Sequence, residues 1–153
     1  MSRLDRTFDR LRREGRTALM PYLTIGYPER DSLPGLVRAA IDGGADLLEL
    51  GLPFSDPLAD GPVIQASTQK ALANGITLRE CLAQTRALRE QGIEVPLMLM
   101  GYYNPIYQMG LQRFAGAAAQ AGADGVIVPD LPPEEATALD EALRQQGLAY
   151  IYM

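Results

Sequence analysis

The middle of the chain carries the run that decides the fold, Leu47-Leu48-Glu49-Leu50-Gly51-Leu52-Pro53-Phe54-Ser55-Asp56-Pro57-Leu58-Ala59-Asp60-Gly61-Pro62. Side chains alternate along a strand, so Leu48 and Leu50 share one face while Leu47 and Glu49 share the other. Two leucines suit the face that packs against helices, which predicts that Glu49 points to the opposite, interior face. The three prolines that follow predict a loop at the carboxyl end of this strand.

Further short apolar runs lie on both sides of this one. Together they predict five strands, at residues 18–25, 47–50, 95–100, 126–128 and 148–153. Between them the apolar period becomes helical, which predicts helices at residues 33–41, 62–73, 77–92, 111–118 and 133–146. Asp31 is the expected N-cap of the first of these, and residues 77–80 have the pattern of a capping box. The first 16 residues form an additional amphipathic helix.

Strand–helix alternation with apolar strands is typical of an α/β protein whose parallel sheet is covered by helices. The same turn, Gly-Ala-Asp, precedes the second strand at residues 44–46 and the fourth at residues 122–124, which indicates a repeating unit. No linker or low-complexity stretch divides the chain, so residues 1–153 are predicted to form a single domain.

Composition excludes several classes of function. Fourteen basic and nineteen acidic residues give a formal charge of −5, which disfavours nucleic acid or an anionic membrane as a partner. No apolar stretch is long enough to span a bilayer, so a cytoplasmic protein is expected. There is no histidine, which excludes histidine-dependent triads and zinc sites, and the single cysteine, Cys81, is expected to be a buried core thiol.

Acid–base chemistry must therefore come from other titratable groups, and the residues after the second strand supply them. A carboxylate buried at Glu49 would have a raised pKa suited to proton transfer, although it could equally be paired with a buried cation or lie at a solvated rim. Asp60 could act with it or could simply cap the helix that starts at Pro62. Asp56 fits a turn, and the whole loop could form a docking surface.

A longer pattern bears on these alternatives. Residues 48–61 closely resemble the signature of tryptophan synthase alpha subunits. The resemblance continues along the whole chain through Thr24-Ile25-Gly26, Gly44-Ala45-Asp46, Met100-Gly101-Tyr102-Tyr103-Asn104 and Val128-Pro129-Asp130-Leu131-Pro132. It implies the (β/α)8 TIM-barrel fold and a lyase of tryptophan biosynthesis, which cleaves indole-3-glycerol phosphate to indole and glyceraldehyde 3-phosphate without a metal or organic cofactor.

The resemblance also implies roles for individual residues. Glu49 matches the principal acid–base group, and Asp60 matches the carboxylate that accepts the indole N–H and stabilises positive charge on the ring. Tyr22, Met100 and Tyr102 match positions that line the indole pocket, though each could also be ordinary barrel packing.

Other matching positions imply a protein partner. They lie on the face that such subunits turn toward a pyridoxal-phosphate beta subunit in a heterotetramer, and they are Pro53, Asp56, Pro57, Asn104 and Asp130.

A closed barrel of this kind needs eight βα units, and the chain supplies four and a fifth strand. The resemblance places the glycine-rich loops that hold the substrate phosphate on the later strands. Two hypotheses therefore stand: a catalytic lyase where the barrel is completed, or a catalytically silent truncated fragment that keeps a folding or beta-subunit-docking surface. An aldolase is disfavoured because the only lysine, Lys70, falls in a predicted helix and not on a strand.

Overall fold

The computed structural model describes residues 1–153 and contains a five-stranded parallel sheet. The strands are β1 (Tyr22–Thr24), β2 (Leu48–Gly51), β3 (Leu97–Met100), β4 (Gly125–Ile127) and β5 (Ala149–Ile151). They are hydrogen-bonded in sequence order, β1-β2-β3-β4-β5, and every neighbouring pair is parallel. The predicted parallel sheet is confirmed, and it corresponds to part of a (β/α) barrel.

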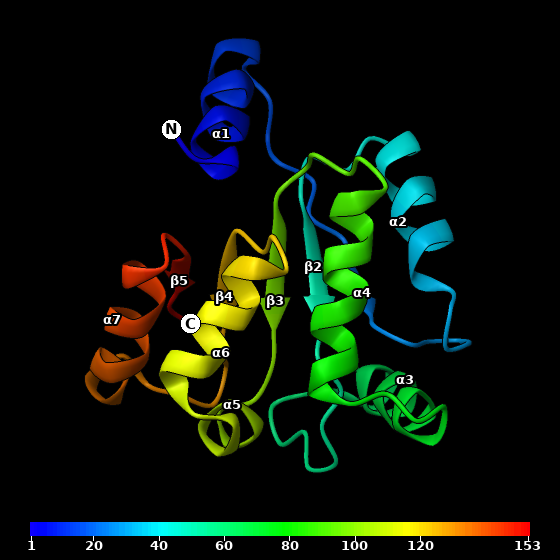
Figure 1. Ribbon diagram of the computed structural model, residues 1–153. Coiled ribbons are helices and arrows are strands. Elements are labelled where there is room, and N and C mark those ends of the chain that lie inside the picture. Colours follow the sequence, from blue (N-terminus) through cyan, green and yellow to red (C-terminus); the bar gives the residue numbers. More distant parts are fainter.

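The helices lie around the sheet and at its two ends (Figure 1). They are α1 (Arg3–Glu14), α2 (Leu33–Asp42), α3 (Pro62–Ala73), α4 (Leu78–Glu90), α5 (Tyr103–Met109), α6 (Leu111–Gln120) and α7 (Thr137–Gln145), with a 3-10 turn η1 (Pro133–Glu135) before α7. In Figure 1, α1 lies at the end where the strands begin, whereas α3, α5 and the β2–α3 loop lie at the end where they finish.

Two separate apolar clusters define the two faces of the sheet. The larger cluster, of 29 buried residues, includes Leu48 and Leu50 of β2 together with the inward sides of the covering helices. The smaller cluster contains Leu47, Met98 and Ile127, with Leu4 of α1 packed against it. Leu47 is therefore on the face opposite to Leu48 and Leu50, and the alternation of the strand puts Glu49 on that same face. The predicted orientation of Glu49 is confirmed.

α1 is attached to the sheet by two matching ion pairs. Asp46 accepts hydrogen bonds from Arg10 and from the backbone N–H of Leu19, and Asp124 accepts them from Arg3 and from the N–H of Leu97. Both aspartates are buried and end the repeated Gly-Ala-Asp turn. The repeat predicted from the sequence thus has a physical function, because each copy binds an arginine of α1 and a backbone N–H at or shortly before the start of a neighbouring strand.

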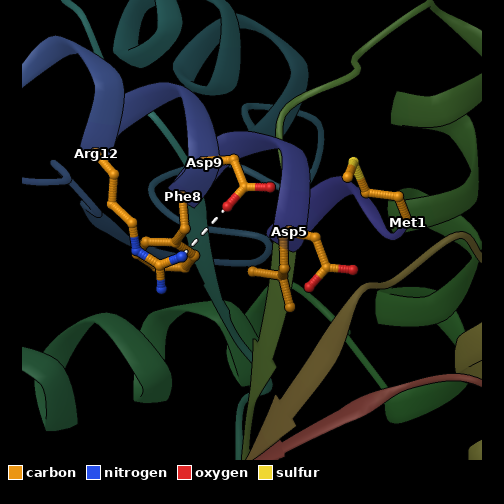
Figure 2. Close-up of a pocket in the computed structure, with 6 residues that line it drawn as sticks. Met1, Asp5, Phe8, Asp9 and Arg12 are labelled. Atoms are coloured by element: carbon orange, nitrogen blue, oxygen red, sulfur yellow. Dashed lines mark hydrogen bonds and ion pairs between the residues drawn. The ribbon is translucent and has the colours of Figure 1, made fainter.

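An open pocket of about 370 Å³ lies along α1 and is lined by Met1, Leu4, Asp5, Phe8, Asp9 and Arg12. Figure 2 shows this pocket, with Asp9 and Arg12 joined by an ion pair on the helix itself. The helix α1, along which this pocket lies, is at the amino-terminal end of the strands, and the β2–α3 loop is at the opposite end (Figure 1). The two predicted carboxylates, Glu49 of β2 and Asp60 of the β2–α3 loop, belong to the opposite part of the sheet.

Several predicted boundaries were wrong. The first strand begins at Tyr22 and not at residue 18, since Pro21 has no N–H to donate to a ladder. Asp31 does not cap α2, whose N-cap is Ser32 without a side-chain cap bond. The predicted helix at 133–146 is divided into η1 and α7 at Ala136. The helix α5 was not predicted. The capping box at Thr77 and Glu80 is confirmed.

Candidate active site

Glu49 lies in the centre of a row of residues that crosses the interior face of the sheet. Its Cα partners are Tyr22 on β1 and Met98 on β3. The Glu49 side chain is half-buried and forms no ion pair, so the alternative of a buried cationic partner is wrong. Burial raises the pKa of the Glu49 carboxyl, and the negative charge of Asp60 raises it further.

Asp60 is the second carboxylate, and it comes from the loop between β2 and α3. The N-cap of α3 is Gly61, and no side chain caps this helix, so the capping interpretation of Asp60 is wrong. The backbone carbonyl of Asp60 accepts a hydrogen bond from the Gln65 side chain, so the Asp60 backbone is held from α3. Burial raises the pKa of Asp60, while hydrogen bonding by the Tyr102 hydroxyl acts in the lowering direction.

Two tyrosines border these carboxylates. Burial raises the pKa of Tyr22, and the charges of Asp60 and Glu49 add to the increase, so all three groups lie within electrostatic reach of one another. The Tyr22 hydroxyl passes so close to Gly51 that no side chain would fit there. A glycine at the end of β2 is thus required by the position of Tyr22.

Tyr102 holds the β2–α3 loop from the side of β3. It is only 4% exposed, and its hydroxyl oxygen accepts a hydrogen bond of 2.9 Å from the backbone N–H of Ala59. Its ring packs against Phe54 of the same loop, with 5.6 Å between the ring centroids. Burial is the main cause of the raised pKa of Tyr102. The residue next to Asp60 is therefore fixed by a buried contact.

Met100 is on the strand next to Glu49 and pairs with Gly51. It is half-buried at the end of β3 and packs against the small cluster of Leu47, Met98 and Ile127. The structure thus brings Tyr22, Glu49, Asp60 and Tyr102 together, and it places Met100 on the neighbouring part of the same face.

The residues expected at a partner interface belong to the β2–α3 loop, to the loop after β4 and to α5. The β2–α3 loop and α5 lie at the carboxyl-terminal end of the sheet (Figure 1). Pro53 and Pro57 are half-buried, and Asp56, Asn104 and Asp130 are exposed. Asp130 also has an internal role, because it accepts a 2.9 Å hydrogen bond from the backbone N–H of Tyr103 at the start of α5. These five residues remain candidates for the interface.

Two hydroxyl groups beside this site were not predicted as site residues. Thr24 at the end of β1 and Ser67 of α3 are buried, and their oxygens are 2.7 Å apart. Thr24 belongs to the motif Thr24-Ile25-Gly26, which was its only signal.

No group of three or more Asp, Glu, Cys or His side chains is arranged to bind a metal ion. No helix is long and apolar enough to cross a membrane.

A parallel βα sheet with two titratable carboxylates at the carboxyl-terminal end of one strand is the arrangement of a (β/α)-barrel enzyme site. The family model of the tryptophan synthase alpha chain matches residues 8–153. The chain belongs to this family.

Similarity to individual proteins supports the same family. The chain is 59% identical to the tryptophan synthase alpha chain of Roseiflexus castenholzii over 152 residues, which are 99% of this chain and 58% of that one. It superimposes on the alpha subunit of Legionella pneumophila with a TM-score of 0.97 at 45% identity, covering 99% of this chain and 58% of that one. For tryptophan synthase of Mycobacterium tuberculosis the TM-score is 0.92 at 38% identity, with 99% and 61% covered. The chain therefore spans somewhat more than half the length of these relatives.

Proposed function

We propose that this chain carries the acid–base half of the active site of a tryptophan synthase alpha-type lyase. The reaction is the aldol-type cleavage of indole-3-glycerol phosphate to indole and glyceraldehyde 3-phosphate. The observation that carries the proposal is the pair of half-buried carboxyls, Glu49 and Asp60, whose pKa values are both raised by burial and which interact electrostatically.

The chemistry needs one group that both gives and takes a proton. In its protonated form Glu49 donates to C3 of the indole ring, which makes the ring cationic. The Glu49 carboxylate then removes the proton of the adjacent glycerol hydroxyl, the C–C bond breaks, and its electrons restore the aromatic ring while the aldehyde forms. Glu49 is protonated again at the end of the reaction, as it was at the start, so the reaction consumes no cofactor. A raised pKa supports this role because both protonation states are then accessible near neutral pH.

Asp60 has a different task in the same step. Its carboxylate accepts a hydrogen bond from the indole N–H and stabilises the positive charge that develops on the ring. The contacts of Ala59 with Tyr102 and of Gln65 with the Asp60 carbonyl support this role, because they fix the backbone on both sides of the carboxylate. Tyr22, Tyr102 and Met100 would then line the space for the indole ring.

A chimera tests this proposal. Residues 1–153 are joined to the remaining carboxyl-terminal part of the Roseiflexus castenholzii chain, the 59% identical relative. Indole release from indole-3-glycerol phosphate is measured for the chimera and for the 153-residue chain. We expect release by the chimera and little by the shorter chain, because a remote substrate phosphate contributes binding energy that orients the reacting end. A folded chimera without indole release would refute the proposal.

A second candidate function is docking to the tryptophan synthase beta subunit, with or without catalysis. It is favoured by large apolar side chains that are exposed near the candidate site, since Leu58 is 92% exposed and Val63 is 79% exposed. Leu58→Gln should weaken binding of the chimera to a beta subunit at least tenfold in a titration. Leu19→Gln, at the other end of the strands, is the matched control and should leave binding unchanged. Equal affinity for both variants would rule out this surface.

A further inference from the structure

A buried pair of hydroxyls joins the first strand to the helix that follows Asp60. Thr24 is the last residue of β1 and Ser67 lies in the second turn of α3, and they are 6% and 8% exposed. Their oxygens are 2.7 Å apart, a short hydrogen bond between elements 43 residues apart in the chain. Such a pair is costly to disrupt, because a buried hydroxyl without a partner loses its hydration without compensation.

Both hydroxyls of the pair make a further contact. The Ser67 hydroxyl also donates to the carbonyl oxygen of Ile64 at 2.9 Å, in the first turn of α3. Thr24 Oγ1 lies 3.4 Å from the hydroxyl oxygen of Tyr22, next to the carboxylates. Each hydroxyl has one proton, so two arrangements are possible. In the first, Ser67 donates to the carbonyl of Ile64 and accepts a hydrogen bond from Thr24. In the second, Ser67 donates to Thr24, and the Thr24 hydroxyl donates to the hydroxyl oxygen of Tyr22. In both arrangements Thr24 and Ser67 stay bonded to each other.

The location of this pair connects it to the site. Thr24 is two residues beyond Tyr22, and Tyr22 is the register partner of Glu49. On the other side, α3 begins two residues after Asp60. The pair therefore attaches the helix next to one carboxylate to the strand next to the other. Two other contacts hold the backbone around Asp60. The Ala59 N–H donates to the Tyr102 hydroxyl, and the Gln65 side chain donates to the Asp60 carbonyl.

We propose that Thr24 and Ser67 are positioning residues, whose hydrogen bond keeps Asp60 within electrostatic reach of Glu49. This inference rests on the pairing of Glu49 and Asp60 in the proposed function. It deepens that function by assigning a role to two residues that do not touch the reacting atoms.

The test follows the titration of Glu49 by carboxyl ¹³C NMR in the 153-residue chain. Asp60→Asn removes the charge of Asp60 and should lower the pKa of Glu49. Thr24→Val keeps the volume and removes one hydroxyl, and Ser67→Ala removes the other. Each should shift the Glu49 titration part of the way toward its position in Asp60→Asn, because α3 is held less firmly and Asp60 moves away from Glu49, while the contacts of Ala59 and Gln65 remain. Thr24→Ser, which keeps the hydroxyl, should restore the wild-type titration.

Thr85→Val is the matched control, since the Thr85 hydroxyl is equally buried and donates to the carbonyl of Cys81 within α4. It should destabilise the fold without moving the Glu49 titration, which separates positioning from loss of stability. If Thr24→Val does not fold, Ser67→Ala carries the comparison. A wild-type Glu49 titration in Ser67→Ala would overturn the inference, and so would an unchanged one in Asp60→Asn. No substrate is used, so failure of the chimera to release indole is a separate result.

Discussion

At the scale of single residues, the site depends on where two acids are buried. Glu49 has leucines on both sides in the sequence, and alternation along β2 puts them in the large core and Glu49 on the other face. Asp60 lies in a loop, so no strand or helix periodicity predicts where its side chain points. Its local sequence suits a helix cap equally well. The structure assigns the cap to Gly61, which leaves the Asp60 carboxylate available for chemistry.

This assignment makes a prediction for Asp60→Asn in the chimera. Turnover should fall by about two orders of magnitude, because an amide cannot supply the negative charge that stabilises the cationic ring. Stability at neutral pH should be unchanged or slightly raised, since burial raises the pKa of Asp60 and ionisation in the folded state therefore costs free energy. Indole release and urea unfolding measure the two effects.

Asp56→Asn serves as the matched control, because Asp56 is an exposed acid in the same loop. It should leave turnover within about twofold of wild type, the range expected of a surface substitution with little structural effect. Wild-type turnover in Asp60→Asn would contradict the catalytic role, whatever its effect on stability.

Glu49 and Asp60 could be named from the sequence because they lie in a long distinctive motif, and the interior direction of Glu49 followed from strand alternation alone. Thr24 and Ser67 could not be paired in this way. Their hydrogen bond joins residues 43 positions apart, and small hydroxyl side chains at the end of a strand and in a helix have no characteristic spacing. The absence of a cationic partner for Glu49 also required the three-dimensional arrangement.

At the scale of elements, α1 is attached by charges and not only by its apolar face. Arg10 and Arg3 bind the buried carboxylates Asp46 and Asp124 at the starts of two different strands. Burial acts to raise the pKa of Asp46, but hydrogen bonds from Arg10 and from the Leu19 N–H outweigh it, so the pKa is lowered. A lowered pKa means that this carboxylate stabilises the fold when ionised.

The attachment of α1 should therefore depend on pH. Asp46 stabilises the fold above its unfolded-state pKa, and the contribution is lost as the pH falls through its lowered folded-state pKa. At pH 7, Asp46→Asn should lower the free energy of unfolding by about 1–2 kcal/mol, a modest value because the arginine partners are partly exposed. The difference from wild type should shrink on acidification in urea-unfolding series.

Asp42→Asn provides the comparison, as Asp42 is an exposed acid at the end of α2 with no ion pair. Its effect on unfolding should be small and similar at every pH. A constant difference between wild type and Asp46→Asn down to pH 3 would show that Asp46 does not act through its charge.

Elements with strong periodicity were the ones that sequence reasoning predicted well. The amphipathic α1, the capped α4 and the order of all five strands were confirmed, because each is determined by local pattern and by the rules of parallel sheets. The short α5 was missed since its seven residues include Pro105 and give little periodicity. The N–H of Tyr103, the first residue of α5, donates to the carboxylate of Asp130 in the loop after β4, a contact that local sequence does not reveal.

At the scale of the whole molecule, both edge strands of the sheet have a neighbour on one side only. The interior face carries a small apolar cluster and the two carboxylates, whereas the other face is covered by helices. The chain covers 58% of the length of two of its relatives. We propose proton transfer for this chain, and we expect turnover only where the rest of the barrel is present.

The proposed proton transfer by Glu49 is tested by the rate of indole release from the Glu49→Gln chimera, measured beside the unsubstituted chimera. Glutamine keeps the volume of the side chain but cannot shuttle a proton, so turnover should fall by about a thousandfold. Circular dichroism should show an intact fold, with stability at neutral pH equal or higher, because the raised pKa of Glu49 makes its ionisation unfavourable in the folded state. Turnover at the unsubstituted rate in a folded Glu49→Gln chimera would contradict the central claim.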